Sequence, residues 1–346
     1  MKAAVFSQVG KLSIEEKAIP DIGPEEALVK VAVCGICGSD IHAYKSGLLF
    51  PIGTIMGHEF TGVLEKVGAK VQNHKIGDRV VVFPSAPCRR CAYCFRGKEN
   101  LCHKSFERSV GEGLERDGAY AEYVRILWPN EMLYKLPDSV SFAQGALVEP
   151  LATGFHAVRQ SRFRPGDQVV VLGAGPIGLS AIQFLKIGGA GKIITVEISS
   201  LRAEIAKSLG ADVVLDPLKE KDALADKVAE LTGGLGADIV FECTGVQAAF
   251  SNSIALTSSG GQIMAVGVIE HETPIDPFSL LIKEVELRGS FGYTSEEFQM
   301  VINFLNQGRI QTQALLSDTI PLMDIEEKGF KRLMSRPDAV KILVKP

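Results

Sequence analysis

Four cysteines of this chain lie in one short segment, at Cys88, Cys91, Cys94 and Cys102. The gaps of two, two and seven residues between them are typical of a site that binds one zinc ion through four thiolates. Four sulfur ligands leave a tetrahedral ion no open coordination position, so such a site stabilises a lobe of the fold. The catalytic chemistry must therefore lie elsewhere.

Disulfides, an iron–sulfur cluster and a nucleic-acid-binding ribbon are the alternatives for this segment. The chain has seven cysteines, an odd number, and residues 1–11 contain no signal-peptide core, so a reducing cytoplasm is expected. Thiolates also suit iron–sulfur clusters, which stay open as an alternative. Basic residues surround the cysteines, at Arg89, Arg90, Arg96 and Lys98. The net charge of −4 nevertheless argues against a nucleic-acid partner.

A second set of possible metal ligands is dispersed along the chain. Cys37 stands in the segment Gly35–His42, His58 and Glu59 follow Gly57, and Glu149 precedes Pro150. Each residue alone is more often structural than ligating, and Cys34 is a rival thiol. Together they offer one sulfur, one imidazole and one or two carboxylates, which is the ligand set of a catalytic zinc with an open position.

A glycine turn predicts a nucleotide site. Gly173, Gly175 and Gly178 form G-x-G-x-x-G, with Pro176 and Ile177 opening a helix directly after an apolar strand. Such glycines permit a tight turn, a close approach of pyrophosphate and close helix packing. Glu197 ends the next strand, where a carboxylate binds ribose hydroxyls and favours NAD over NADP. The other candidate cofactor contacts are Arg202, which could instead assist NADP, and Val266.

The elements that must position these residues fall into two regions with different patterns of predicted secondary structure. With 346 residues, about two domains are expected, and no apolar segment is long enough to span a membrane without interruption. The first part is β-rich, with strands predicted at 27–33 and 78–83. From residue 165 strands and helices alternate, which predicts a parallel sheet. The predicted elements there are 168–172, 176–187, 193–196, 201–209, 222–231, 239–241 and 263–266. A helix at 295–306 and a strand at 340–344 close the chain.

These motifs, taken in chain order, resemble those of the zinc-dependent medium-chain dehydrogenases/reductases over essentially the whole chain. The resemblance implies an α/β fold, with a GroES-like β domain formed by residues 1–152 and 290–346 and an inserted Rossmann domain, a doubly wound parallel sheet, at 153–289. It implies an active site in the cleft, dimers or tetramers, and Cys37 and His58 as ligands of a catalytic zinc. Glu59 and Glu149 would be carboxylates that bind this zinc directly or through water.

The chemistry implied is hydride transfer between an alcohol and NAD. Zinc would polarise a substrate hydroxyl, and the nicotinamide would accept the hydride. Ser39 and His42 match family positions that pass the proton to solvent, a step that suits a hydroxyl and an imidazole. A turn-capping Ser39 and a surface His42 are the structural alternatives.

The choice of substrate depends on finer likeness. Ser39 and the pair Glu149 and Pro150 resemble the branch of sorbitol, xylitol and (R,R)-2,3-butanediol dehydrogenases. In the segment Ser290–Tyr293, Gly292 stands where sorbitol-type members carry an arginine. We therefore expect a small secondary diol or a sugar alcohol as the substrate.

Other functions remain as alternatives. They are an L-threonine or galactitol-phosphate dehydrogenase of the same family, and a non-catalytic nucleotide and zinc scaffold. A hydrolase is disfavoured, because there is no Gly-x-Ser-x-Gly elbow and His58-Glu59 does not continue to a second histidine.

Overall fold

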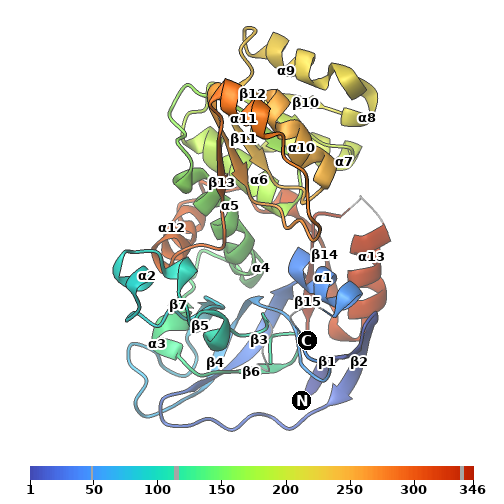
Figure 1. Cartoon of the computed structure of the whole chain (residues 1–346). Helices are drawn as coiled ribbons and strands as arrows, with labels where there is room; N and C mark the ends of the chain where they lie inside the picture. The colour runs from blue at the N-terminus through green and yellow to red at the C-terminus, as the bar shows by residue number, and fades with distance from the viewer. Residues whose placement is uncertain (48–49, 113–116, 336–338) are drawn as a thin grey trace. The chain divides into compact units, whose positions relative to one another are not determined.

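The structure, a computed structural model, describes residues 1–47, 50–112, 117–335 and 339–346. The chain divides into two compact units (Figure 1). Unit 1 consists of Met1–Glu149 with Thr294–Pro346, and unit 2 of Pro150–Tyr293. None of the described helices is both long and apolar enough for a membrane crossing.

Unit 1 is built mainly on antiparallel β structure, with one parallel pair, β14 and β15. Its main sheet has the order β14-β15-β3-β4-β5-β7, with β6 paired to β3, and β1 pairs separately with β2. The strands are β1 Lys2–Gln8, β2 Lys11–Glu16, β3 Ala27–Gly35, β4 Glu59–Val67, β5 Arg79–Val82, β6 Tyr123–Ile126, β7 Leu133–Lys135, β14 Leu316–Pro321 and β15 Lys341–Lys345. The short helices are α1 Gly38–Ser46, α2 Ala92–Phe95, α3 Pro129–Met132, α4 Phe142–Ala146 and α13 Lys331–Ser335.

The two ends of the sequence meet in this sheet. β15 pairs antiparallel with β3, so that Leu343 opposes Gly35 and Val344 opposes Cys34. Helix α12 (Ser295–Asn306) returns the chain to unit 1 and begins in a capping box, in which Thr294 and Glu297 each bond the other's backbone. The strand predicted at the end of the sequence thus completes the first sheet.

Unit 2 is a parallel six-stranded sheet of order β10-β9-β8-β11-β12-β13. The strands are β8 Gln168–Leu172, β9 Lys192–Val196, β10 Val213–Leu215, β11 Ala237–Glu242, β12 Thr257–Ala265 and β13 Glu286–Gly289. The helices are α6 Pro176–Ile187, α7 Ser200–Leu209, α8 Pro217–Glu220, α9 Leu224–Leu231, α10 Gln247–Leu256 and α11 Pro277–Lys283. Helix α5 (Val148–Gln160) crosses the division between the units. This strand order is that of a Rossmann domain, which confirms the predicted fold class.

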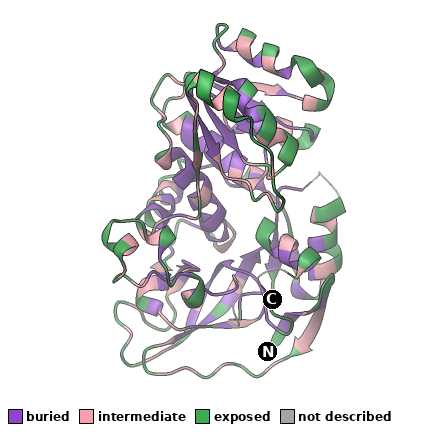
Figure 2. Cartoon of the chain, in the orientation of Figure 1, coloured by how far each residue is buried: buried purple, intermediate pink, exposed green. Residues whose placement is uncertain are grey.

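Burial follows the expected logic of each sheet. In unit 2, Val169, Val170 and Val171 of the central strand β8 are fully buried, as both faces of a parallel sheet should be. In unit 1, β4 is buried at its start and exposed further along. Figure 2 shows both sheets mainly in the buried colour. The buried start of β4 is where the candidate site lies.

Candidate metal centres and cofactor site

Cys37 lies where the chain leaves β3 and enters α1. Its backbone is extended (φ −89°, ψ 157°), and its N–H donates to Asp40 Oδ2 at 3.0 Å. Asp40 is fully buried and also accepts a hydrogen bond from the Tyr120 hydroxyl at 2.6 Å. These bonds fix the backbone that carries the thiol.

His58 follows a position that requires glycine. Gly57 has φ 99°, and a Cβ there would lie 2.9 Å from the sulfur of Cys34. The Nδ1 atom of His58 is 3.2 Å from the carbonyl oxygen of Gly111 and 3.7 Å from Asp40 Oδ1. An Nδ1–H that donates to this carbonyl leaves Nε2 with a free lone pair, as a metal ligand needs.

Glu59, the first residue of β4, is paired with a lysine from the other end of the sequence. Lys341 Nζ lies 2.7 Å from Glu59 Oε1 and 2.6 Å from Oε2, and it donates to the carbonyl oxygen of Ile36 at 2.8 Å. Both side chains are almost fully buried. Burial alone lowers the pKa of Lys341, but Glu59 and then Cys37 outweigh burial and raise it. Lys341 is therefore a fixed cation beside the candidate site.

Cys37, His58 and Glu59 converge. One ligand atom of each lies within 4.8 Å of the others. Burial, followed by the negative charge of Glu59, raises the pKa of Cys37, so a cation at this point would favour the thiolate. A thiolate, an imidazole and a carboxylate around one point fit a zinc ion with an open position.

Glu149, in the first turn of α5, is not in this three-residue group among the residues described. It is 9% exposed, and burial, with Glu59 as the next contribution, raises its pKa to about 7. Glu149 is thus a second buried carboxylate, and the charge of Glu59 contributes to its raised pKa.

Ser39 and His42 both lie on α1, one turn apart. Ser39 is exposed in the first turn of α1, and His42 is half-buried. The carbonyl oxygen of His42 accepts a hydrogen bond from Ser46 Oγ at 2.9 Å. Helix α1 therefore connects the Cys37 end to groups that water can reach.

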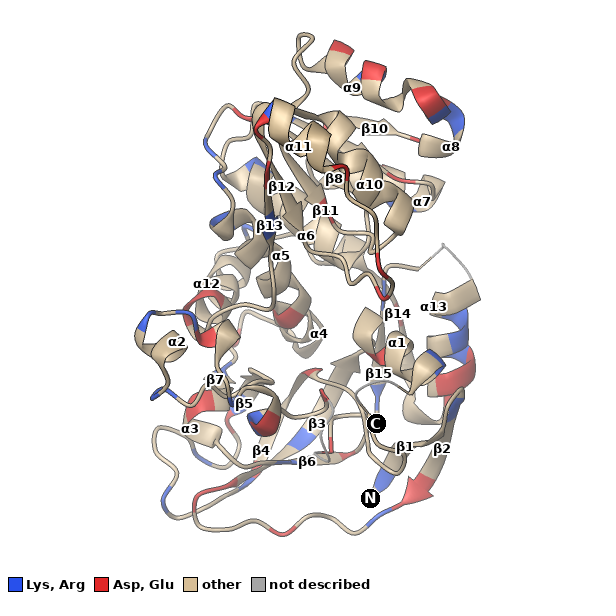
Figure 3. Cartoon of the chain, viewed as in Figure 1, with Lys and Arg blue, Asp and Glu red and all other residues tan. Residues whose placement is uncertain are grey.

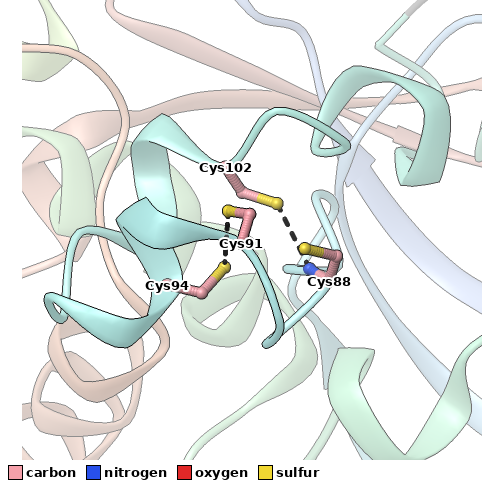
Figure 4. Close-up of side chains that lie close together, drawn as sticks. All are labelled: Cys88, Cys91, Cys94 and Cys102. Carbon is pink, nitrogen blue, oxygen red and sulfur yellow. Dashed lines mark hydrogen bonds between the residues drawn. The ribbon is translucent and has the colours of Figure 1, made fainter.

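The sulfur atoms of the four lobe cysteines, Cys88, Cys91, Cys94 and Cys102, lie close together (Figure 4). All four ligand atoms lie within 4.8 Å of one another, and all four are free cysteines. The sulfurs of Cys91 and Cys94 are 3.6 Å apart, whereas a disulfide requires about 2.05 Å. Backbone N–H groups of Cys88 and Lys104 lie 3.2 and 3.4 Å from the sulfur of Cys102, as amides that stabilise a thiolate do. This closed set fits a structural zinc.

The segment around α2 is rich in Lys and Arg (Figure 3), and it is also tied to the rest of unit 1. Glu99 Oε2 accepts a hydrogen bond from the N–H of Ser295 at 3.0 Å and another from its hydroxyl. Ser295 is the first residue of α12. The lobe therefore holds the helix by which the chain re-enters the unit.

The glycine turn has the local geometry that a dinucleotide needs. Gly173 has φ 89°, and a Cβ on Gly178 would lie 1.9 Å from the Gly173 carbonyl oxygen. Gly175 caps α6, and a Cβ there would meet nothing within 4 Å. The turn thus leaves open space at the N-terminus of a twelve-residue helix, the place where phosphate binds. Pro176 and Ile177 are the first residues of that helix.

Glu197 follows β9 and is 8% exposed. Its Oε2 accepts the N–H of Ala174 at 2.7 Å and its Oε1 accepts the N–H of Ser199 at 2.8 Å. Arg202 lies in the first turn of α7, where its N–H donates to Ser199 Oγ at 3.3 Å. Val266, directly after β12, donates its N–H to the carbonyl oxygen of Glu242 at 2.9 Å. Glu197 thus supports the glycine turn through the N–H of Ala174.

The centre formed by Cys37, His58 and Glu59 is called the first centre from here on. Reasoning from the sequence missed three charged groups beside it. Asp40 lies inside the motif of Cys37 but received no role. Lys341 had a signal, because a lysine inside an apolar strand is unusual. Glu112, which follows the residue that bonds His58, had none.

Comparison with known proteins agrees with this architecture. Residues 23–138 match the alcohol dehydrogenase GroES-like domain, and residues 176–307 match the zinc-binding dehydrogenase domain. The chain is 39% identical to (R,R)-butanediol dehydrogenase of Bacillus subtilis (strain 168), over 100% of both sequences. The chain belongs to the zinc-binding dehydrogenase family. It is also 33% identical to the sorbitol dehydrogenase of the same organism, over 100% of this chain and 97% of that one.

A solved structure shares the fold of this zinc-binding dehydrogenase. The crystal structure of 2R,3R-butanediol dehydrogenase from Bacillus subtilis superposes with a TM-score of 0.89 at 37% identity, covering 100% of this chain and 99% of that chain. The predicted family resemblance is confirmed, and with it the GroES-like and Rossmann-type domains.

Proposed function

We propose that the protein is an NAD-dependent zinc dehydrogenase that interconverts a secondary alcohol and a ketone, with a small diol or sugar alcohol as its substrate. The observation that carries this proposal is the convergence of Cys37, His58 and Glu59 within 4.8 Å. Relatives named for butanediol and sorbitol support the substrate class.

Cys37, His58 and Glu59 would hold the catalytic zinc, with Glu149 as a further carboxylate beside it. Bound zinc would polarise a substrate hydroxyl, and bound nicotinamide would accept the hydride. Asp40 and the Gly111 carbonyl orient His58, while Lys341 offsets the negative charge of Glu59. Cys88, Cys91, Cys94 and Cys102 would hold the second, structural zinc.

The proton released by the substrate needs a path to water, and α1 supplies candidate groups. Ser39 would accept the proton at its hydroxyl oxygen while its own hydroxyl proton moves on toward His42, one turn later, which would pass a proton to solvent. The exposed Ser39 and the half-buried His42 on α1 support this route.

Unit 1 would be the catalytic domain and unit 2 the NAD-binding domain. Gly173, Gly175 and Gly178 would admit the pyrophosphate, Glu197 would bind the ribose hydroxyls, and Arg202 and Val266 would line the cofactor site. We further propose a homodimer or homotetramer that works in the cytoplasm without nucleic-acid or membrane partners.

The test is turnover of a substrate panel followed by NADH absorbance. The panel contains 2,3-butanediol stereoisomers, sorbitol, xylitol, glycerol and L-threonine, with NAD or NADP and with or without a chelator. Chelator-sensitive oxidation of a diol or sugar alcohol with NAD is expected. Zinc-replete protein that reduces neither cofactor with any of them would contradict the proposal.

A further inference from the structure

Glu112 is a carboxylate at the first metal centre that the proposed chemistry does not use. It directly follows Gly111, whose carbonyl oxygen lies 3.2 Å from Nδ1 of His58. The backbone at Gly111 cannot shift freely, because a Cβ there would lie 2.0 Å from the carbonyl oxygen of Gly57, the residue before His58. Glu112 is therefore held at a fixed place next to a candidate zinc ligand.

Ser85 anchors one of the two carboxylate oxygens of Glu112. The hydroxyl of Ser85 donates to Glu112 Oε2. The two chain segments are themselves joined, since Val110 N–H donates to the Pro84 carbonyl oxygen at 2.9 Å and Ser85 bridges Ser109. Among the described residues no hydrogen bond to Oε1 of Glu112 is recorded, so this oxygen can accept one from a ligand.

Glu112 belongs to the loop that packs against Gly57 and His58 of the first metal centre. Burial raises its pKa, whereas the nearby His58 lowers it. The Glu112 side chain is half-buried, so it is not sealed off from a small molecule that binds beside His58.

We propose that Glu112, oriented by Ser85, is a specificity-determining residue that accepts a hydrogen bond from a second hydroxyl of the substrate. An ionised carboxylate only accepts hydrogen bonds, so it would select substrates with a hydroxyl donor besides the one that reacts. A monohydric alcohol leaves Glu112 without this donor. This inference rests on the proposed function and narrows its substrate class to diols and polyols.

The test compares 2,3-butanediol with 2-butanol, which differ by one hydroxyl. Because hydrogen bonds to charged groups are strong, Glu112→Gln should lower kcat/KM for the diol about tenfold to a hundredfold and for 2-butanol less than about threefold. Ser85→Ala should shift the same ratio in the same direction by a smaller factor. Quenching of NADH fluorescence should show a matching rise in the Kd of the diol for the enzyme–NADH complex.

The control is Glu107→Gln, which removes an exposed carboxylate paired with Lys104 and should leave both substrates unchanged. Zinc per chain is measured for every variant. Equal losses for diol and 2-butanol in zinc-replete Glu112→Gln would overturn the inference and leave the proposed function intact. If Glu112→Gln loses zinc, the Ser85→Ala variant decides instead. An unchanged ratio of kcat/KM for 2,3-butanediol to kcat/KM for 2-butanol in Ser85→Ala would then overturn the inference. A wild-type enzyme that oxidises neither alcohol nor any polyol would contradict the proposed function itself.

Discussion

The buried ion pair of Lys341 and Glu59 is the residue-scale feature with the largest expected energetic effect. Both oxygens of Glu59 lie within 2.7 Å of Lys341 Nζ, out of contact with water. Removal of one partner from such a pair leaves an uncompensated buried charge, which costs about 3–5 kcal/mol. Breaking the pair is therefore expected to act first on the stability of unit 1 and only then on catalysis.

We predict that Lys341→Met lowers the free energy of unfolding of the zinc-free protein by about 3–5 kcal/mol, measured by urea denaturation. The double variant Glu59→Gln with Lys341→Met should cost clearly less than the sum of the two single changes. A loss below about 1 kcal/mol for Lys341→Met, or simple additivity, would show that the pair is not coupled.

Cys37 tests the assignment of the first centre at the same scale. Cys37→Ser should reduce zinc from two ions per chain to one and abolish alcohol oxidation, while circular dichroism and the binding of NAD stay unchanged. The matched control is Cys34→Ser, since Cys34 is the neighbouring buried thiol outside the metal group. If Cys34→Ser lost the zinc and Cys37→Ser kept it, the ligand assignment would be wrong.

At the scale of elements, the cysteine lobe is hydrogen-bonded to the start of α12. Glu99 of the lobe bonds Ser295 at the start of that helix. We expect Cys91→Ser to lose one zinc and lower the melting temperature, because a structural zinc contributes directly to folding. Cys91→Ser protein that stays folded should keep Cys37, His58 and Glu59 in place at the first centre. An inactive Cys91→Ser with full zinc content and unchanged stability would reverse the roles of the two centres.

The lobe should also release protons when it binds zinc. Hydrogen bonds from backbone groups lower the pKa of Cys91 to about 6, whereas burial, then Cys91, raises the pKa of Cys94 to about 12. At pH 7 the first is mainly thiolate and the second is a thiol, so zinc must displace a proton from Cys94 and binds more weakly as the pH falls. Calorimetry of the zinc-free protein in buffers of different ionisation enthalpy should show this release. In the Cys94→Ser variant the release should fall.

Elements with local signals could be predicted closely. β8 at Gln168–Leu172, α6 at Pro176–Ile187 and α12 at Ser295–Asn306 have the predicted bounds. Glycine, proline and a capping threonine mark these ends within a few residues. The strand predicted at 263–266 overlaps the end of a longer one, Thr257–Ala265, and extends one residue past it. The earlier residues of the observed strand include Gly260 and Gly261. Glycine is unfavourable in strands, so the sequence understated its length.

At the scale of the whole molecule, the two units should respond to different ligands. NAD at a concentration of 100 Kd should stabilise the protein by about 2.7 kcal/mol. Hydrogen exchange should slow mainly around Gly173–Ile187 and Glu197, whereas a chelator should speed exchange in residues 88–102 and near His58. NADP should give little protection, because the proposed position of Glu197 beside the ribose would repel a 2′-phosphate. Equal protection by both nucleotides would contradict the NAD assignment.

The site itself was only partly predictable from sequence. Cys37, His58 and Glu59 lie in short motifs, and their spacing suggested a metal. The pairing of Glu59 with Lys341 joins residues 282 positions apart, and the position of Glu112 depends on how one loop packs against Gly57. Contacts of this kind depend on tertiary structure and leave no local pattern.

That separation along the chain also orders events during synthesis. At about 5–20 residues per second, Glu59 leaves the ribosome tens of seconds before Lys341 exists. Until then β15 cannot pair with β3, and burial of Glu59 has no cation to offset it. All of unit 2 is made in this interval, so unit 2 can fold before the main sheet of unit 1 is complete. The nascent chain is therefore expected to acquire its nucleotide-binding half before its metal-binding centre is complete.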